Sequence, residues 1–428
     1  MRALDKEVSA LEWCKKQSDV SKNGALEGNH YGAALSSVFQ PIYSLAHRRP
    51  IGFEGLVRAR KENGELLSPI DLFRYLPEQH CIPLDRLTRY LHVQNFIRQA
   101  TEEFWLFLNI HPAILLHGKN HGRFFGDLLS ESGLAPNNVV VEILEDSIED
   151  KGMLTETIQY YRDLGCLIAI DDFGTGNSNF DRVWKISPDI VKLDKSVVHD
   201  LSTNKVARRM LPNLVSLIHE CGSLVLLEGV EQEEQALLAV DAGVDFVQGY
   251  YFAKPAAELR TDATSGALGE GGMNLSGLCS AYHNLVSKRD KCAKEKLKVY
   301  IDMFKTITDG VTAGLSIDEL IPDLLSLSGI ERCYMLNSRG NQVGLNFLPE
   351  EHERLFPQRF AMLEDTRNVS WFRRPYFRKA MNNPGEIQIS RPYLSMTAGM
   401  LCITLSVMVK APDGEKLVFC CDIDWSDN

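Results

Sequence analysis

The 428-residue sequence lacks a long apolar run, a paired-cysteine motif and an excess of positive charge. No stretch approaches the ~20 consecutive apolar residues of a membrane helix, and the N-terminal segment has no apolar signal-peptide core. We therefore expect a cytoplasmic protein without a membrane span. Ten cysteines occur without CxxC spacing, which argues against a cysteine-bound zinc site. The net charge of -11 argues against binding of nucleic-acid polymers, because a phosphate backbone needs a basic face.

What the sequence does contain is an alternation of β-like apolar runs and amphipathic segments from Ser37 to about Pro255. This alternation is typical of βα units and a parallel sheet, and the length of the region suits a TIM-like (β/α)8 barrel. A doubly wound open sheet is the competing architecture. We favour the barrel because polar residues follow many of the apolar runs, whereas an open sheet gathers its site at one switch point.

A stretch rich in Gly, Ala, Ser and Thr marks a boundary between two domains. After it, apolar residues near heptad spacing leave two interpretations open, a connecting helix packed on its own domain or a coiled-coil dimer seam. Further β-like runs with turn signals predict an antiparallel α+β module at the C-terminal end. The expected segments are a helical lead-in (1–36), the barrel domain (37–256), a linker (257–272), a connecting helix (273–305) and the α+β module (306–428).

Residues that can bind a metal ion, or sit beside one, follow seven of the apolar runs. Carboxylates beside buried strand ends are costly unless a cation or hydrogen-bond donors compensate them, which suggests a shared charge partner. Mg²⁺ and Mn²⁺ prefer such oxygen ligands, and adjacent aspartates can each hold one of two nearby cations. An aspartate pair before a Gly-rich loop also fits a simple turn, but the further ligands favour a metal site. In chain order the residues are Glu54, Asn109, Glu142, Asp171 with Asp172, Lys192, Glu228 and Gln248.

These residues belong to short motifs that occur in order over half of the chain. The motifs are Phe39 to Ile42, Glu54 to Arg58, Asn109 to Pro112, Glu142 to Glu145, Asp171 to Asn177, Lys192 to Ser196, Glu228 to Glu231 and Gln248 to Phe252. Their order and spacing resemble those of the EAL-domain cyclic-di-GMP phosphodiesterases. The resemblance implies a TIM-like barrel that cleaves cyclic-di-GMP to linear pGpG with Mg²⁺ or Mn²⁺ at a two-metal site.

The resemblance also implies a role for each residue. Lys192 would orient the attacking water, and Glu145 would anchor the loop that follows the aspartate pair. Gln40 and Gln248 would make polar contacts around the site, and Arg58 would contact a phosphate; a purely structural hydrogen bond is the alternative for each of these three. The ligands of the first metal ion would be Glu54, Asn109, Glu142, Asp171 and Glu228, with Asp171 shared and Asp172 holding the second ion.

Five positions depart from the usual pattern of that family. Gly55 stands where the family has Ala, a small-for-small change that should leave Glu54 in place. His111 stands where Ser is frequent, and we expect a hydrogen-bonded wall residue there rather than an extra metal ligand. These departures bear on catalytic rate and dimer-coupled activation more than on metal binding. The remaining three are Ala59, Asn177 and Leu227.

The C-terminal module resembles the PAS-like sensor fold of Cache domains. The matching strings are Arg374 to Ala380, Ser390 to Tyr393 and Cys421 to Ile423, with Tyr376 where Trp is usual. By this resemblance, Arg374 and Asp422 would clamp the carboxylate and ammonium of a small zwitterion beside Tyr393. A ligand-free dimerisation or docking module that binds a protein is the alternative, and a homodimer is expected.

The sequence therefore predicts a metal-dependent cyclic-di-GMP phosphodiesterase that its C-terminal sensor module regulates. A second hypothesis is a catalytically weak cyclic-di-GMP receptor that signals to a partner. The completeness of the ligand set, with Asp172 and Lys192 present, favours the enzyme. A third hypothesis, an enolase-like barrel acting on a small acid, fits the tandem aspartates and Lys192 poorly.

Overall fold

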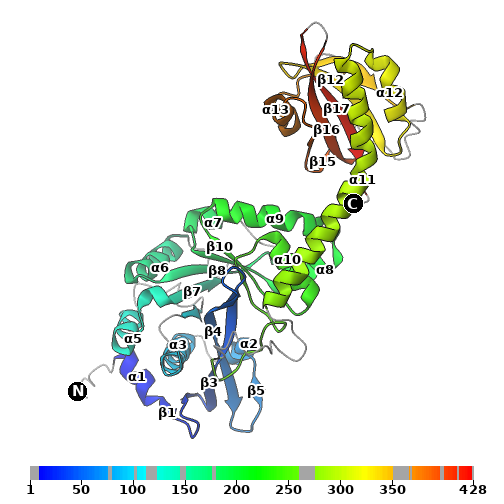
Figure 1. Cartoon of the computed structure of the whole chain (residues 1–428). Coiled ribbons are helices and arrows are strands. Elements are labelled where there is room, and N and C mark those ends of the chain that lie inside the picture. The colour runs from blue at the N-terminus through cyan, green and yellow to red at the C-terminus, as the bar shows by residue number, and fades with distance from the viewer. Residues whose placement is uncertain are drawn as a thin grey trace, which may run out of the picture. The chain divides into compact units, whose positions relative to one another are not determined.

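The computed structural model divides the chain into two compact units, Met1–Leu285 and Val286–Asn428 (Figure 1). Helix α11 (Leu275–Thr312) contributes residues to both. Among the described residues, no helix combines the length and apolar character that a membrane span requires. The structure describes residues 9–75, 80–100, 104–111, 123–144, 151–175, 180–259, 275–349, 366, 369–395, 400–411 and 414–426.

Eight strands of the first unit form a closed ring, which confirms the predicted barrel. Neighbouring strands follow the order β3-β11-β10-β9-β8-β7-β6-β4, and the β3–β4 pair closes the ring. Strand β3 runs antiparallel to both of its neighbours because a short turn joins it to β4, whereas the other pairs are parallel. The strands are β3 (Ala33–Ser44), β4 (Arg49–Lys61), β6 (Trp105–Asn109), β7 (Val139–Leu144), β8 (Leu167–Phe173), β9 (Ile190–Leu193), β10 (Leu224–Leu227) and β11 (Phe246–Val247).

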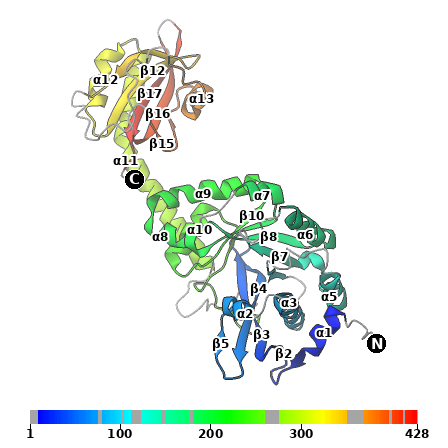
Figure 2. The same ribbon diagram turned by 180° about the vertical axis from the view of Figure 1, so that it is seen from behind.

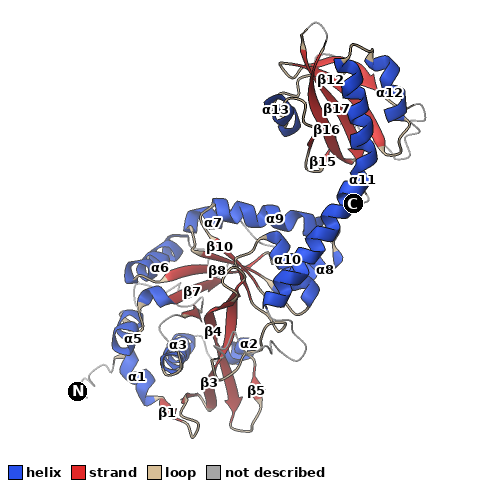
Figure 3. Ribbon diagram, viewed as in Figure 1, coloured by secondary structure: helices blue, strands red, loops and turns tan. Residues whose placement is uncertain are grey.

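Helices surround the strand ring in both opposite views (Figures 2 and 3). Within the described part of the predicted helical lead-in, α1 (Ala10–Lys16) is followed by two strands, β1 (Ser18–Val20) and β2 (Leu26–His30), which extend the sheet from β3. Strand β5 (Leu66–Leu67) pairs with β4. The other helices are α2 (Pro69–Tyr75), α3 (Cys81–Ile97), α5 (Phe124–Ser132), the 3-10 helix η3 (Pro136–Asn138), α6 (Lys151–Leu164), α7 (Phe180–Ile186), α8 (Lys195–Thr203), α9 (Lys205–Glu220) and α10 (Glu233–Ala242).

One buried apolar layer crosses the interior of the barrel, and the partly buried Ile51, Trp105 and Leu167 pack against it. Seven strands each contribute one buried side chain to it. The eighth strand, β4, contributes Gly52, where an added Cβ would lie 2.9 Å from the Phe107 ring and 2.6 Å from the Trp105 carbonyl oxygen. Glycine therefore makes room for the Phe107 ring. The seven side chains are Ile42, Phe107, Val140, Ala169, Ile190, Leu226 and Phe246.

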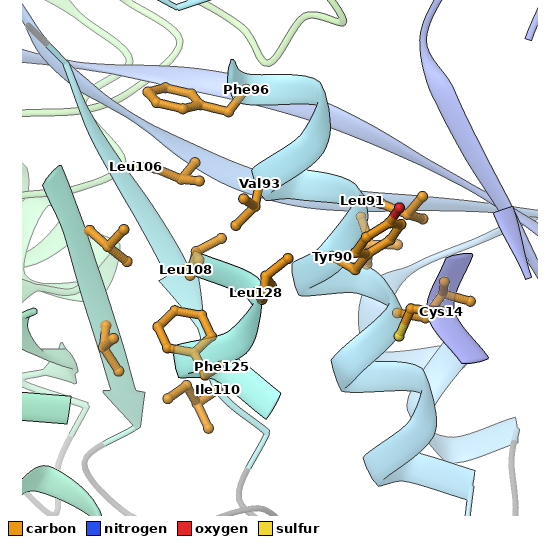
Figure 4. Packing of buried hydrophobic residues seen from close by; sticks show 14 of the residues in the cluster. Cys14, Tyr90, Leu91, Val93, Phe96, Leu106, Leu108, Ile110, Phe125 and Leu128 are labelled. Atoms are coloured by element: carbon orange, nitrogen blue, oxygen red, sulfur yellow. The ribbon is translucent and has the colours of Figure 1, made fainter. Parts of the chain in front are cut away.

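The opposite face of each strand packs against the helices. Figure 4 shows Val93 of α3 and Leu128 of α5 near Leu106 and Leu108 of β6, and all four side chains are buried. These β6 residues alternate with Phe107, which points into the barrel. Because the pleat separates the two cores, the apolar sequence of each strand fixes which residues face the barrel axis.

The second unit is built on an antiparallel sheet in the order β13-β12-β17-β16-β14, with β15 also paired to β16. This arrangement confirms the α+β architecture predicted for the tail. Side chains of β17 alternate between two cores, with Phe419 stacked on Phe304 of α11 and Val418 packed on the other face with Phe377 of α13. The elements are α12 (Ile317–Leu325), β12 (Ile330–Asn337), β13 (Gln342–Phe347), α13 (Pro375–Asn382), β14 (Gln388–Ile389), β15 (Tyr393–Leu394), β16 (Leu401–Lys410) and β17 (Lys416–Asp424).

Candidate active site

Eight polar residues form the layer that follows the apolar interior, at the carboxyl ends of the parallel strands. Side chains two residues apart in a strand point to the same side. Each polar residue lies two positions from a residue of the apolar layer, as Glu142 does from Val140, or from Gly52 in β4. The structure therefore brings together these predicted site residues, Gln40, Glu54, Asn109, Glu142, Asp171, Lys192, Glu228 and Gln248.

Lys192 lies among three carboxylates at this mouth. Its Nζ is 2.6 Å from Glu142 Oε1, 2.6 Å from Glu228 Oε1 and 3.0 Å from Asp171 Oδ1. Burial acts to lower the pKa of Lys192, but the three carboxylates outweigh it and raise the pKa well above its ordinary value. The side chain therefore stays an ammonium ion at neutral pH.

Glu54 is held by two amide groups from neighbouring strands. Asn109 Nδ2 donates to Glu54 Oε1 at 2.8 Å, and Gln248 Nε2 donates to Glu54 Oε2 at 2.8 Å. Burial acts to raise the pKa of Glu54, yet the charge of Lys192 and these hydrogen bonds lower it overall. Glu54 is therefore an ionised carboxylate with a fixed orientation.

The aspartate pair is presented by an irregularity in β8. The register with β9 shifts between Ile170 and Phe173, and Asp172 adopts a left-handed backbone with φ 58°. The Asp172 N–H donates to Asp171 Oδ1 at 3.0 Å. Burial, followed by the charge of Asp171, raises the pKa of Asp172 to about 6. The bulge thus adds a second carboxylate beside Asp171 without displacing Asp171 from its layer.

The charge of this site fits a divalent cation. Five carboxyl groups, from Glu54, Glu142, Asp171, Asp172 and Glu228, lie around one ammonium group, that of Lys192, which pairs with three of them. Burial raises the pKa of Glu142 well above its ordinary value and that of Glu228 to about 8. Within the described part of the chain, Glu142 Oε2 is buried without a hydrogen-bond partner. A buried carboxyl oxygen without a hydrogen-bond donor, such as this one, is suited to ligate a hard cation once the carboxyl group has lost its proton.

The carboxylates surround an ammonium rather than an open position. No group of three His, Cys, Asp or Glu side chains within the described ranges is already arranged around a vacant cation position. The distances of Lys192 Nζ from three carboxylates explain this, because an ammonium at 2.6–3.0 Å lies where a cation would compete for the same oxygens.

Gln40, at the β3 position of the polar layer, and Arg58, outside it, contact backbone carbonyl groups, and two further predicted positions lie outside the described residues. Gln40 Nε2 donates to the Ala253 carbonyl oxygen at 3.2 Å. The half-buried Arg58 donates from Nη1 to the Val57 carbonyl oxygen at 2.9 Å. The predicted loop anchor Glu145 and the departure at Asn177 fall outside the described residues.

His111 forms part of the wall beside β6. Its ring stacks on Phe73 with centroids 4.6 Å apart, and its backbone N–H donates to Asp85 Oδ1 at 2.9 Å. Asp85 in turn pairs with Arg89, whose Nη1 donates to the Tyr161 hydroxyl at 3.1 Å. Sequence reasoning missed this buried network, although an acidic and a basic residue four positions apart on a helix are a usable signal.

The departures at Gly55, Ala59 and Leu227 have structural explanations. A Cβ on Gly55 would lie 2.9 Å from Cγ of the His92 ring, so glycine accommodates this buried histidine. Ala59 is buried opposite Leu35 of β3. Leu227 is buried in the core that lies outside the strand ring. None of these three side chains takes a place in the polar layer.

In the second unit, the predicted sensor residues lie in one cluster. The Arg374 guanidinium lies over the Tyr393 ring, 5.1 Å from its centroid, and the Tyr393 hydroxyl is 3.4 Å from Asp422 Oδ1. Asp422 also accepts from Arg332 Nε at 2.8 Å. Sequence reasoning missed Arg332, because its partner lies 90 positions away in the chain.

Comparison with known families adds to this geometry. The EAL domain model matches residues 26–255, more than half of the chain. The chain belongs to the EAL-domain family. The uncharacterized EAL-domain containing protein YkuI of Bacillus subtilis is 26% identical over 354 residues, which cover 79% of this chain and 82% of YkuI.

Two other EAL relatives match the barrel region. The cyclic di-GMP phosphodiesterase RocR of Pseudomonas aeruginosa is 30% identical over 52% of this chain and 58% of RocR. The cyclic di-GMP phosphodiesterase PdeF of Escherichia coli is 28% identical over 54% of this chain and 30% of PdeF. This chain thus matches only part of the length of either EAL protein.

A solved EAL structure has the same fold over nearly the whole chain. The crystal structure of YkuI in complex with substrate c-di-GMP and calcium aligns with a TM-score of 0.76 and 22% identity. The alignment covers 92% of this chain and 96% of the YkuI chain. The fold of this EAL protein is therefore shared beyond its barrel.

We predict that Gly55→Ala destabilises the protein by about 1–3 kcal/mol, because the added methyl group overpacks the site against His92. The cost should fall in a His92→Ala background, as measured by a double-mutant cycle of denaturant unfolding. Gly126→Ala is the control, since its Cβ would meet the tip of Leu164 at 3.3 Å and the Tyr160 hydroxyl at 3.8 Å, and neither contact is a ring held in place as His92 is. Equal costs of Gly55→Ala in both backgrounds would contradict the explanation.

Proposed function

We propose that this EAL protein is a divalent-metal-dependent phosphodiesterase that hydrolyses cyclic-di-GMP to linear pGpG. The observation that carries this proposal is the convergence of carboxylate, amide and ammonium groups from all eight strands on one layer. The similarity to RocR and PdeF, which are cyclic di-GMP phosphodiesterases, supports the proposed substrate and reaction. The cyclic-di-GMP and calcium in the YkuI crystal structure support the dinucleotide and a divalent ion.

In this proposal the carboxylate layer holds two cations, Mg²⁺ or Mn²⁺. When bound, they would lower the pKa of a water molecule and offset the charge of the phosphate. Asp171 would be shared between the ions, and Asp172 would hold the second one. The ligands of the first ion would be Glu54, Asn109, Glu142, Asp171 and Glu228.

Lys192 and the surrounding polar groups act on the water and the phosphate. Because its pKa is raised, Lys192 donates hydrogen bonds and does not accept a proton. It would orient the attacking water, while Arg58 contacts a phosphate through its planar guanidinium. Gln40 and Gln248 would make polar contacts around the bound dinucleotide. Water adds to phosphorus, the bond to one ribose 3′ oxygen breaks, and that oxygen takes up a proton.

The C-terminal module would regulate the barrel through α11. This helix contributes Leu278 to a core of the first unit and Phe304 to a core of the second. The PAS-like or Cache-like identity of the module and a homodimer in solution belong to the same proposal. A loop anchored by Glu145 would complete the site.

A second candidate function is a catalytically weak receptor that binds cyclic-di-GMP and signals to a partner without turnover. The YkuI crystal structure, in which an EAL protein is in complex with c-di-GMP and calcium, supports binding of the dinucleotide in either case. The two functions differ in their product.

The purified full chain, incubated with cyclic-di-GMP and Mn²⁺, should release pGpG, detected by chromatography. EDTA should stop the reaction and added Mn²⁺ should restore it, whereas unchanged dinucleotide at full occupancy would leave the receptor function.

We predict that Glu228→Ala lowers kcat on the order of 100-fold or more, because changes even in the partners of metal ligands cost ~10–100-fold. The fold should persist, since the side chain is 20% exposed and lies at the barrel mouth. Steady-state hydrolysis and thermal unfolding measure the two effects. Glu27→Ala, at an exposed glutamate of β2, is the control that should keep full activity. Wild-type turnover by Glu228→Ala would refute the metal assignment.

We predict that Lys192→Met abolishes hydrolysis but tightens Mn²⁺ binding about tenfold or more. The change removes an ammonium that competes for three carboxylates, and about 1.4 kcal/mol corresponds to each tenfold in affinity. Calorimetric titration with Mn²⁺ in the absence of dinucleotide measures the effect. Lys205→Met, at an exposed lysine of α9, should leave Mn²⁺ affinity unchanged. Weaker Mn²⁺ binding by Lys192→Met would show that the lysine does not compete with the cation.

A further inference from the structure

The second unit contains a buried ion pair in which both carboxylate oxygens of the acidic partner already accept hydrogen bonds. Arg332 of β12 and Asp422 of β17 are directly opposite in the sheet and are 3% and 0% exposed. Arg332 Nε donates to Asp422 Oδ2 at 2.8 Å. Asp422 Oδ1 accepts from the Thr404 hydroxyl at 2.7 Å and lies 3.4 Å from the Tyr393 hydroxyl. Both carboxylate oxygens of Asp422 are therefore occupied by groups of the protein itself.

The basic partner of this ion pair has one guanidinium nitrogen that makes no hydrogen bond to any residue that the structure describes. Arg332 Nη1 is buried and has no hydrogen-bond partner among the described residues. Leaving such a donor unpaired costs about 1–3 kcal/mol, more when the group is charged. A native protein rarely keeps this cost without a reason, and an acceptor from a ligand would remove it.

A second guanidinium lies beside the same aromatic ring. The Arg332 and Arg374 guanidinium carbons are 5.5 Å and 5.8 Å from the centroid of the Trp371 ring. Within the described part of the chain, the half-buried Arg374 guanidinium makes no hydrogen bond or ion pair. Helix α13 begins directly after Arg374, whose own side chain makes no capping hydrogen bond to the first N–H groups. These features add positive potential at one place.

The charges of the cluster leave a net positive site. Among the described residues of the cluster, the charges of Arg332 and Asp422 cancel and that of Arg374 remains. An anion would be attracted, whereas the ammonium group of a zwitterion would have to displace Arg332 from Asp422. The half-buried rings of Trp371 and Tyr393 lie against the guanidinium groups and offer apolar faces to an organic body, while the fully buried Tyr334 ring contacts the Arg332 guanidinium.

We propose that Arg332 and Arg374, with the rings of Tyr334, Trp371 and Tyr393, form a binding site for a small organic carboxylate without an ammonium group. The carboxylate would accept from Arg332 Nη1 and from the Arg374 guanidinium. The aromatic rings favour the carboxylate over inorganic phosphate, which has no apolar part to bury. The site lies within the second unit and requires neither metal nor cyclic-di-GMP.

Matched pairs of probes test the chemistry of the ligand. The full chain, without metal or dinucleotide, is titrated by calorimetry with acetate, propionate, pyruvate and succinate, and with glycine, alanine and inorganic phosphate. Propionate and alanine differ only by the α-ammonium group, and we expect propionate to bind at least tenfold more tightly. Alanine binding as tightly as propionate, phosphate binding more tightly than every carboxylate, or no binding of any of the four carboxylates would each overturn the proposal.

Two variants test the residues. Arg332→Lys keeps a positive charge beside Asp422 but removes Nη1, and Arg374→Ala removes a guanidinium that makes no ion pair among the described residues. Each should weaken the binding of the best carboxylate at least tenfold, while the exposed neighbour variant Arg373→Ala should not. Thermal unfolding without ligand checks that Arg374→Ala is folded. Unchanged binding in both Arg332→Lys and Arg374→Ala would overturn the proposal, whatever the barrel hydrolyses.

Discussion

Closure of the eight-stranded ring determines which side chains can meet at the mouth of the barrel. The β3–β4 pair completes the ring, and the apolar layer then sets which face of each strand points inward. A shift of one residue in β7 would move Val140 out of the interior and Glu142 with it. The polar layer is thus a consequence of the apolar one. Gly52 contributes to this by leaving space for Phe107 rather than by carrying a side chain.

Closure also brings several carboxyl groups together at the barrel mouth, and the protein's own cationic and amide groups compensate their charge only in part. Burial, and after it the charges of neighbouring carboxylates, raises the pKa of Glu142 and of Glu228. Lys192 compensates three of them, and two amide groups orient Glu54. The remaining acidity is the physical reason to propose cations in this layer. A mouth built only for stability would have apolar residues at these positions, since buried ion pairs contribute little to stability.

The sequence predicted the barrel and its polar layer because both follow from local patterns, an apolar run followed by a polar residue such as Glu142 or Lys192. The direction of β3 was not in that pattern, because it depends on the short turn before β4. The contact between Gly55 and His92 joins residues from different elements, and the pairing of Arg332 with Asp422 spans 90 positions. Long-range pairings of this kind follow from the fold and not from the sequence near either residue.

The two units bury charge in opposite ways. The barrel mouth has more carboxylates than cationic groups, whereas the cluster around Arg332 has more guanidinium groups than carboxylates. In the second unit this cluster and α11 lie on opposite faces of the sheet, because even-numbered residues of β17 such as Asp422 face the cluster and odd-numbered ones such as Phe419 face α11. The strands β12, β16 and β17 each carry side chains on both faces, so they connect the cluster to the core that contains Phe304 of α11. A sheet with two packed faces transmits a change in the cluster as a shift of whole strands, since its side chains leave few voids to absorb it.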